Sequence, residues 1–256
     1  MKSILLCEGE TDQIILSYYF INQFSFEYDE ERSHRIRHYA RKGVPYAYVQ
    51  KVKSAQHENE LVIWNVGGRD NIPAALEHIL KLNSFNTDRF YERIIVIADK
   101  DAEEESAVFW NKIKEIITNN DTKAKFAEQE WFKGNLTCEF DAIRTVNFLM
   151  LNLPAEGNGA LETFLLYALK ERGKADKYIA QRAQMFVDSL VKNQARFDNM
   201  YLNKRRLRTK APLAVFFGIT SPDRVFTEMN DMLKAINWER YKTIQKGFEK
   251  LSCFKC

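Results

Sequence analysis

Cysteine, glycine and proline are scarce in this sequence, which has 4 cysteines, 10 glycines and 5 prolines in 256 residues. So few cysteines argue against a disulfide-stabilised secreted protein and favour the reducing cytoplasm. The scarcity of glycine and proline argues against disorder. No segment reaches the roughly 18 consecutive apolar residues that a membrane span requires, and the amino-terminal residues lack the pattern of a signal peptide. We therefore expect a folded cytoplasmic protein that does not enter a membrane.

The sequence also lacks a large excess of positive or negative charge. Lysine and arginine total 38 and the acidic residues total 35, which gives a net charge of +3. Such a balance neither requires nor excludes a nucleic-acid partner, so the distribution of the charges must decide. Hydrophobic residues make up 45% of the chain, enough for a sizeable core. The length suits one large domain or a domain with an appendage.

Short apolar runs alternate with amphipathic stretches in the first part of the chain. Runs typical of buried strands occur at residues 3–7, 60–65, 93–98 and 145–151. Helical patterns follow the first three runs, beginning near residue 12, after the stretch "GGRDNIP" and within "DAEEESAVFW". Alternating strands and helices predict an α/β fold, a Rossmann-like parallel sheet flanked by helices.

The pattern changes after about residue 155. Residues 159–172, 177–193, 223–236 and 238–251 all have the spacing of amphipathic helices. We expect an α/β core over residues 1–155 and a mainly helical lobe, packed on that core, over residues 156–256. The polar, basic and aromatic residues 26–58 interrupt the core as an insertion or a hairpin.

Acids and glycines follow the predicted strands. In an open parallel sheet, functional sites lie beyond the carboxyl ends of the strands. Acids follow the first and third strands and a glycine pair follows the second, namely Glu8, Asp12, Asp99, Asp101, Gly67 and Gly68. Glycines there let the backbone approach a ligand or a neighbouring loop. Each acid alone could instead cap a helix or face solvent.

Taken together, these four acids predict a metal site. Carboxylates gathered at one edge repel one another unless a cation or a proton neutralises them. Hard oxygen ligands suit Mg²⁺ or Mn²⁺. Asp99 and Asp101 are two residues apart, so in extended chain both would point to the same side.

The stretches "CEGETD", "NVGG" and "IADKDA", each closing a predicted strand in that order, resemble a Toprim domain. That domain is shared by topoisomerases, bacterial primases, recombination mediators and the nucleases of the OLD (overcoming lysogenization defect) family. The spacing of Glu8 and Asp12 is most similar to the OLD branch, and also to stand-alone Toprim-like proteins of bacteria. The resemblance covers about the first 105 residues.

The resemblance implies a two-metal nuclease that uses Mg²⁺ or Mn²⁺. Glu8, Asp99 and Asp101 would be catalytic, and these three together with Asp12 would bind the metals. The stretch "PAEGNGALETFLL" resembles the segment that carries a further acid, which points to Glu162 as a metal ligand; Glu139 in "LTCEFD" is a rival.

The stretch "TKAPLAVFFG" resembles a lysine-bearing segment, which points to Lys210 as a catalytic residue. The resemblance also suggests a role in phage defence. The large ATPase domain of many OLD proteins is absent, so an ATPase would have to be a separate chain; a second copy of this chain is another candidate partner.

Two basic runs are candidate contacts for nucleic acid, DNA in preference to RNA: Arg35, Arg37, Arg41 and Lys42 in the insertion, and Lys204, Arg205, Arg206 and Arg208 near the third helical stretch. Basic residues beside aromatics suit phosphate contact with base stacking. Either run could also be a solvated face or pair with nearby acids. The alternative function is a binding module without catalysis on a Toprim scaffold. A small-molecule phosphotransferase is disfavoured, because no GxxxxGK[ST] loop occurs.

Overall fold

The computed structural model describes residues 1–28, 35–36, 47–54, 59–85, 90–100, 103–120, 124–154, 159–193, 202–222, 233 and 236–254. The chain divides into two compact units. Unit 1 comprises Met1–Asn152 together with Lys250–Cys256, and unit 2 comprises Leu153–Glu249. The division expected from the sequence, at residue 155, had placed the last residues with the helical region, whereas the structure groups them with unit 1.

Unit 1 is built on one mixed sheet, which has eight strands among the described residues. The strand order is β2-β4-β5-β1-β6-β8-β7, and β3 pairs with β4 beside this path. The strands are β1 (Lys2–Cys7), β2 (Phe26–Tyr28), β3 (Arg35–Ile36), β4 (Ala47–Ser54), β5 (Glu60–Asn65), β6 (Arg93–Asp99), β7 (Trp131–Thr137) and β8 (Ile143–Leu153).

The centre of the sheet is parallel, and the predicted α/β class is confirmed. β1 pairs in parallel with β5, where Cys7 lies beside Asn65, and with β6, where Leu6 lies beside Val96. All residues of β1 after Lys2 are buried. A parallel strand that is covered on both faces reads as a continuous apolar run, and this is why the sequence revealed it.

Antiparallel strands extend this centre on both sides. β4 pairs with β5, β2 and β3 pair with β4, and β7 pairs with β8. The segment 26–58 therefore adds strands to the sheet, as the hairpin interpretation expected. β7 was not predicted, because its residues alternate between buried and exposed positions and so form no continuous apolar run.

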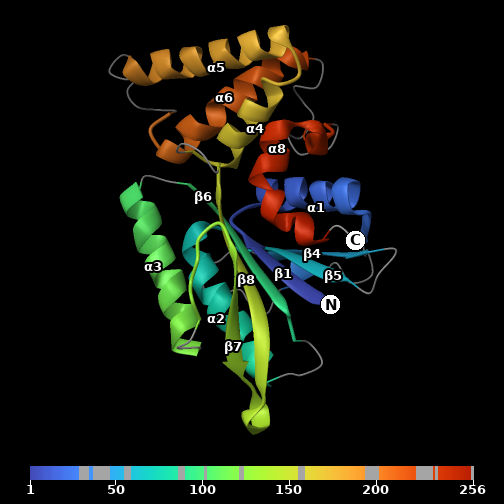
Figure 1. Cartoon of the computed structure of the whole chain (residues 1–256). Coiled ribbons are helices and arrows are strands. Elements are labelled where there is room, and N and C mark those ends of the chain that lie inside the picture. The colour runs from blue at the N-terminus through green and yellow to red at the C-terminus, as the bar shows by residue number, and fades with distance from the viewer. Residues whose placement is uncertain are drawn as a thin grey trace. The chain divides into compact units, whose positions relative to one another are not determined.

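The helices of unit 1 follow the parallel strands in the predicted order. α1 (Glu10–Phe24) follows β1, and α3 (Glu103–Asn120) follows β6. α2 (Ile72–Phe85) follows β5 through the short turn η2 (Arg69–Asn71). Figure 1 shows α2 and α3 on one side of the sheet and α1 on the other.

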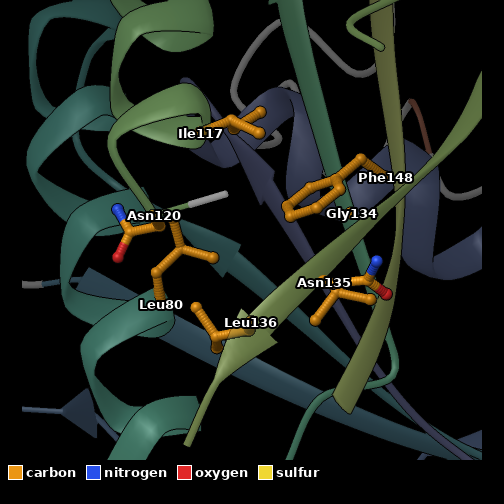
Figure 2. Close-up of a pocket in the computed structure, with 8 residues that line it drawn as sticks. Leu80, Ile117, Asn120, Gly134, Asn135, Leu136 and Phe148 are labelled. Atoms are coloured by element: carbon orange, nitrogen blue, oxygen red, sulfur yellow. The ribbon is translucent and has the colours of Figure 1, made fainter. Parts of the chain in front are cut away.

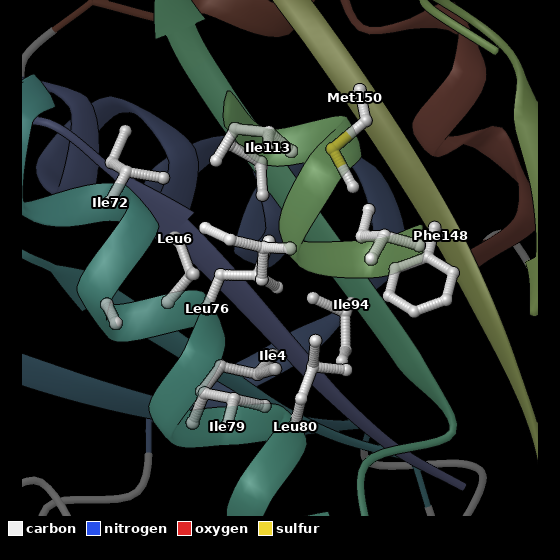
Figure 3. Close-up of a cluster of buried hydrophobic side chains, with 14 of the residues drawn as sticks. Ile4, Leu6, Ile72, Leu76, Ile79, Leu80, Ile94, Ile113, Phe148 and Met150 are labelled. Carbon is white, nitrogen blue, oxygen red and sulfur yellow. The ribbon is translucent and has the colours of Figure 1, made fainter. Parts of the chain in front are cut away.

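The main core lies between the sheet and the α2–α3 layer. Ile4 and Leu6 of β1 point into it together with Leu76 of α2, Ile113 of α3 and Phe148 of β8 (Figure 3). Alternate residues of a strand face opposite sides, so the residues between them in β1 face the α1 side. Burying β1 on both faces makes it the strand around which both layers are organised.

Unit 2 is mainly helical in its described residues. Its helices are α4 (Leu161–Leu169), α5 (Lys174–Lys192), α6 (Arg205–Thr220) and α8 (Lys242–Gly247), with the short turn η6 (Trp238–Arg240). Two rings of its core, those of Phe164 and Phe248, meet edge to face with centroids 5.6 Å apart. A side chain at Gly247 would collide with the Phe164 ring, so this close approach requires glycine.

The helical predictions for this region agree with the described residues in part. Segments 159–172 and 177–193 form α4 and α5, while 238–251 forms only short helices. Most of 223–236 lies outside the described residues. α6 was not predicted as a helix, because it contains Pro212 in its interior, which normally disfavours a helix. Within the ranges given above, no helix has the length and apolar character needed to cross a membrane.

The end of the chain completes unit 1. In η7 (Glu249–Phe254) the Lys250 carbonyl accepts a hydrogen bond of 2.7 Å from the Trp131 indole N–H. Phe254 is 1% exposed and meets the Phe20 ring at 5.1 Å between centroids. The terminal residues therefore fill part of the core on the α1 side.

We expect Phe254→Ala to lower the free energy of unfolding by about 3–5 kcal/mol, because it removes a fully buried ring. Urea denaturation followed by tryptophan fluorescence measures this loss. Cys253→Ala is the matched control, since its side chain is exposed and its removal should change stability by less than about 0.5 kcal/mol. Equal effects of the two substitutions would contradict the packing described here.

Candidate active site

The loops after β1, β5 and β6 lie at one edge of the sheet, because these adjacent strands are parallel. Backbone hydrogen bonds join the first two loops. The Val66 N–H donates to the Cys7 carbonyl at 3.0 Å, and the Gly68 N–H donates to the Glu8 carbonyl at 2.7 Å. The residues that the sequence selected after β1 and β5 are therefore neighbours in space.

Glu8 connects the ends of β1 and β6. Its Oε1 accepts a hydrogen bond of 2.8 Å from the backbone N–H of Asp99. Glu8 and Asp99 are both half-buried. The side chain of Glu8 thus reaches across to the last residue of β6, and two predicted catalytic acids lie side by side.

Asp12 has the geometry of a helix cap. Its Oδ2 accepts a hydrogen bond of 2.6 Å from the Gly9 N–H, which begins α1. This is the capping interpretation that the sequence left open for each acid. The hydrogen bond holds the Asp12 carboxylate at the start of α1, at the same edge of the sheet as Glu8. Glu10, in the first turn of α1, is exposed.

The glycine pair adopts backbone conformations that other residues avoid. Gly67 has a φ of 78° and Gly68 a φ of 131°, both in the positive range where a side chain is strained. The Asn65 Oδ1 accepts from the Gly67 N–H at 3.0 Å, and the Asn71 side-chain amide donates to the Val66 carbonyl at 3.1 Å. The glycines are thus needed to bring this loop against Glu8.

Cys7 is the last residue of β1, immediately before Glu8, and it is fully buried. Burial raises the pKa of its thiol well above the usual value, and the carboxylates of Asp12 and Glu8 raise it further. The pKa shift comes mainly from burial, and the two carboxylates add to it. It also keeps the thiol protonated, so Cys7 is unsuited to act as a nucleophile.

Asp101 lies outside the described residues, so its expected place beside Asp99 stays a prediction. Among the residues that the structure describes, no group of three or more His, Cys, Asp or Glu side chains is arranged to hold a metal ion. The metal centre is therefore also a prediction, supported by the neighbouring positions of Glu8 and Asp99.

Glu162 and Lys210, chosen separately from the sequence, form an ion pair within unit 2. Glu162 lies in the first turn of α4 and is 7% exposed, and Lys210 lies on α6. A buried carboxylate needs such a partner, because burial of an unpaired charge is costly.

Glu139 was the alternative to Glu162 as the additional metal ligand. It lies far from the strand ends that carry Glu8 and Asp99. It is exposed in η3 (Glu139–Asp141), which joins β7 to β8. The adjacent Cys138 contacts the Asn83 carbonyl at 3.5 Å, near the last turn of α2. Because α2 begins at the glycine loop and extends about 20 Å away from it, η3 lies at the opposite end of the sheet (Figure 1). Glu139 is therefore not part of this site.

The predicted nucleic-acid contacts are described only in part. Arg37, Arg41 and Lys42 lie outside the described residues, as do the side chains of Arg35, Arg205 and Arg206. Lys204 is exposed and immediately precedes α6. The Arg208 Nε donates to the Leu202 carbonyl at 2.6 Å, so this guanidinium helps to hold the start of α6.

A small apolar hollow lies between α2, α3 and the β7–β8 pair. Leu80, Ile117, Leu136 and Phe148 point toward one another around it (Figure 2). None of its lining residues is an acid, a base or a nucleophile. The hollow is a feature of packing and offers no second reactive centre.

We expect the Cys7 thiol to resist iodoacetamide in the folded protein, because its side chain is inaccessible, and to react only as unit 1 unfolds. Exposed Cys253 should react in the folded state and serves as the internal control. Peptide mass spectrometry at increasing urea concentrations follows both thiols. Labelling of Cys7 without urea would show that the end of β1 is open.

The family described as "Protein of unknown function (DUF3226)" matches residues 2–224. Among solved structures, the hypothetical protein PH0156 from Pyrococcus horikoshii OT3 is similar, with a TM-score of 0.50 and 16% identity over 99% of this chain and 93% of that chain. At this identity the likeness concerns the fold alone. No curated protein matches the sequence. Since the family match spans most of the chain, the protein belongs to the DUF3226 family.

Proposed function

We propose that this protein hydrolyses phosphodiester bonds of nucleic acid with divalent cations, in the manner of the Toprim nucleases of the OLD branch. The observation that carries the proposal is the hydrogen bond from the Asp99 N–H to Glu8 Oε1. It brings together acids from the ends of two parallel strands, which is where α/β sheets form their functional sites.

The carboxylates at this edge are of the chemical type that Mg²⁺ and Mn²⁺ prefer. Carboxylate oxygens are the preferred ligands of both cations, and the carboxylates of Glu8 and Asp12 both act on the buried Cys7 thiol. Glu8, Asp12, Asp99 and Asp101, all in unit 1, are the proposed ligands. When bound, such cations supply activation of water and neutralisation of phosphate charge.

The chain's own residues orient these groups. The Asp99 N–H fixes one oxygen of Glu8 and the Gly9 N–H fixes one oxygen of Asp12. Lys210 and Glu162 form their ion pair within unit 2. The proposed partner is a nucleic acid, DNA before RNA, with a separate ATPase chain or a second copy as further proposed partners.

A second candidate function is a nucleic-acid-binding or partner-binding module without catalysis. The capping role of Asp12 favours it, because a carboxylate that caps a helix has a structural reason to be there. Binding without cleavage, unaffected by chelation of divalent cations, would distinguish this function from hydrolysis.

We expect Glu8→Gln and Asp99→Asn each to abolish binding of Mn²⁺ in calorimetry and to lower the cleavage rate by at least about 100-fold. The glutamine keeps an oxygen that can accept the Asp99 N–H, so the substitution removes charge and preserves the hydrogen bond. Assays should include plasmid, single-stranded DNA and RNA.

Glu10→Gln is the control for these variants, because Glu10 is an exposed acid of the same segment, and it should bind and cleave like the wild type. If the wild type and the acid variants bind Mn²⁺ and cleave equally well, the reaction takes place elsewhere in the protein. Wild-type protein that neither binds Mn²⁺ nor cleaves would contradict the proposed function.

A further prediction concerns the ion pair of Glu162 and Lys210. Lys210→Met should lower the free energy of unfolding by roughly 1–3 kcal/mol, because it leaves a buried carboxylate without its cation. The double variant Glu162→Gln/Lys210→Met should regain stability in thermal unfolding. A double variant that is no more stable than Lys210→Met would contradict this account of the pair.

A further inference from the structure

Two tyrosines of unit 2 are exposed, and a cationic side chain lies over the ring of each. Tyr167 of α4 is 42% exposed and Tyr178 of α5 is 57% exposed. The Lys170 Nζ lies 4.4 Å from the Tyr167 ring centroid, and the Arg182 Cζ lies 5.1 Å from that of Tyr178. Neither pair belongs to the basic runs that the sequence analysis selected.

The two pairs lie on α4 and α5, which follow one another in the chain. α4 and α5 are in contact, and Lys170 is close enough to Lys177 for the second ammonium group to act on the first. Burial lowers the pKa of Lys170, and the charge of Lys177 lowers it further. We call Tyr167, Lys170, Lys177, Tyr178 and Arg182 the α4–α5 platform. It gathers three cations around two aromatic rings.

The acids near this surface are already engaged. Asp176 faces the Arg172 Nε at 3.9 Å, and Asp188 accepts a hydrogen bond of 3.0 Å from the Gln184 amide. Residues 167–182 carry five basic and two acidic side chains, so this part of the chain has a net positive charge. The mutual repulsion of Lys170 and Lys177 would be relieved by an anion bound between them.

We propose that the α4–α5 platform binds single-stranded nucleic acid, with bases stacked on the two tyrosines and phosphates held by the three cations. The proposal rests on the proposed function in taking nucleic acid as the substrate. Lys170 and Arg182 each lie over one face of a tyrosine ring. A base can then stack on the opposite face of that ring. Only unpaired bases present their faces for such stacking, so the surface suits a single strand and not a duplex.

The orientation of α5 supports this use of the surface. Ala180, Ala183 and Val187 are its buried residues, and α5 contacts α6 within unit 2. At 100° per residue, Tyr178 and Arg182 fall on the opposite side of the helix. The outward face thus carries an aromatic ring and a cation one turn apart.

The test is fluorescence anisotropy of a labelled oligothymidine and a labelled duplex with the full chain, in the presence of a chelator so that no cleavage occurs. The wild type should bind the single strand more tightly than the duplex. Tyr178→Ala and Tyr167→Ala should each weaken single-strand binding about 5-fold or more. Tyr178→Phe, which keeps the ring and loses only the hydroxyl that accepts from the Arg182 Nε, should bind like the wild type.

Two further variants make the test specific. The double variant Lys170→Gln/Arg182→Gln should reduce the slope of log affinity against log salt by about 1.4, since each phosphate contact on a single strand contributes about 0.7. Phe186 cannot serve as the matched control, because it lies one turn after Arg182 on the same ridge of α5. Phe85→Ala is used instead, since Phe85 is a comparably exposed aromatic residue (58%) at the end of α2 in unit 1 and lies outside the platform, so its loss should leave binding unchanged.

The outcomes separate this inference from the proposed function. Tyrosine variants that bind within 2-fold of the wild type, or an equal loss in Phe85→Ala, overturn the platform even if the protein cleaves with Mn²⁺. Platform-dependent binding by a protein that never cleaves with Mg²⁺ or Mn²⁺ upholds the platform and contradicts the hydrolase. Failure of the wild type to bind a single strand overturns the platform, and a protein ligand would then be the alternative occupant.

Discussion

The parallel pairing of β1 with both β5 and β6 is the constraint on which the candidate site depends. Because the three strands run the same way, the loops that follow them meet at one edge. Hydrogen bonds from the Gly68 N–H to the Glu8 carbonyl and from the Asp99 N–H to the Glu8 carboxylate then join the three loops. A change of register in β1 would move Glu8 to the other face of the sheet and separate it from Asp99.

The two units offer different chemistry. Unit 1 presents carboxylates held by backbone N–H groups at the end of a rigid sheet, and this is the kind of support that a reactive centre needs. Unit 2 pairs a buried acid with a lysine and presents exposed tyrosines beside cations on α4 and α5. Acids suit a metal-assisted reaction, whereas cations and aromatic rings suit recognition of a nucleic-acid strand.

Some features of the sheet and of the candidate site were predicted from the sequence, and others were not. The apolar runs of β1, β5 and β6 predicted the centre of the sheet, and the acids that follow them predicted the neighbouring positions of Glu8 and Asp99. Lys210 and Glu162 were chosen by resemblance, and their ion pair is consistent with a shared role. Glu139 had an equally suggestive local sequence. Only the contact of Cys138 with the end of α2 removed it from the site, because local spacing says nothing about which end of a sheet a loop occupies.

The sequence by itself determined the periodic elements, because continuous burial on both faces demands apolar residues at every position of the central strands. It also determined the glycine loop, since Gly67 and Gly68 adopt positive φ values that other residues disfavour. Only the tertiary structure decided what depends on distant contacts. It decided that β7 joins the sheet and that Phe254 fills the core of unit 1. Such features arise from packing between segments far apart in the chain, and no local pattern encodes that packing.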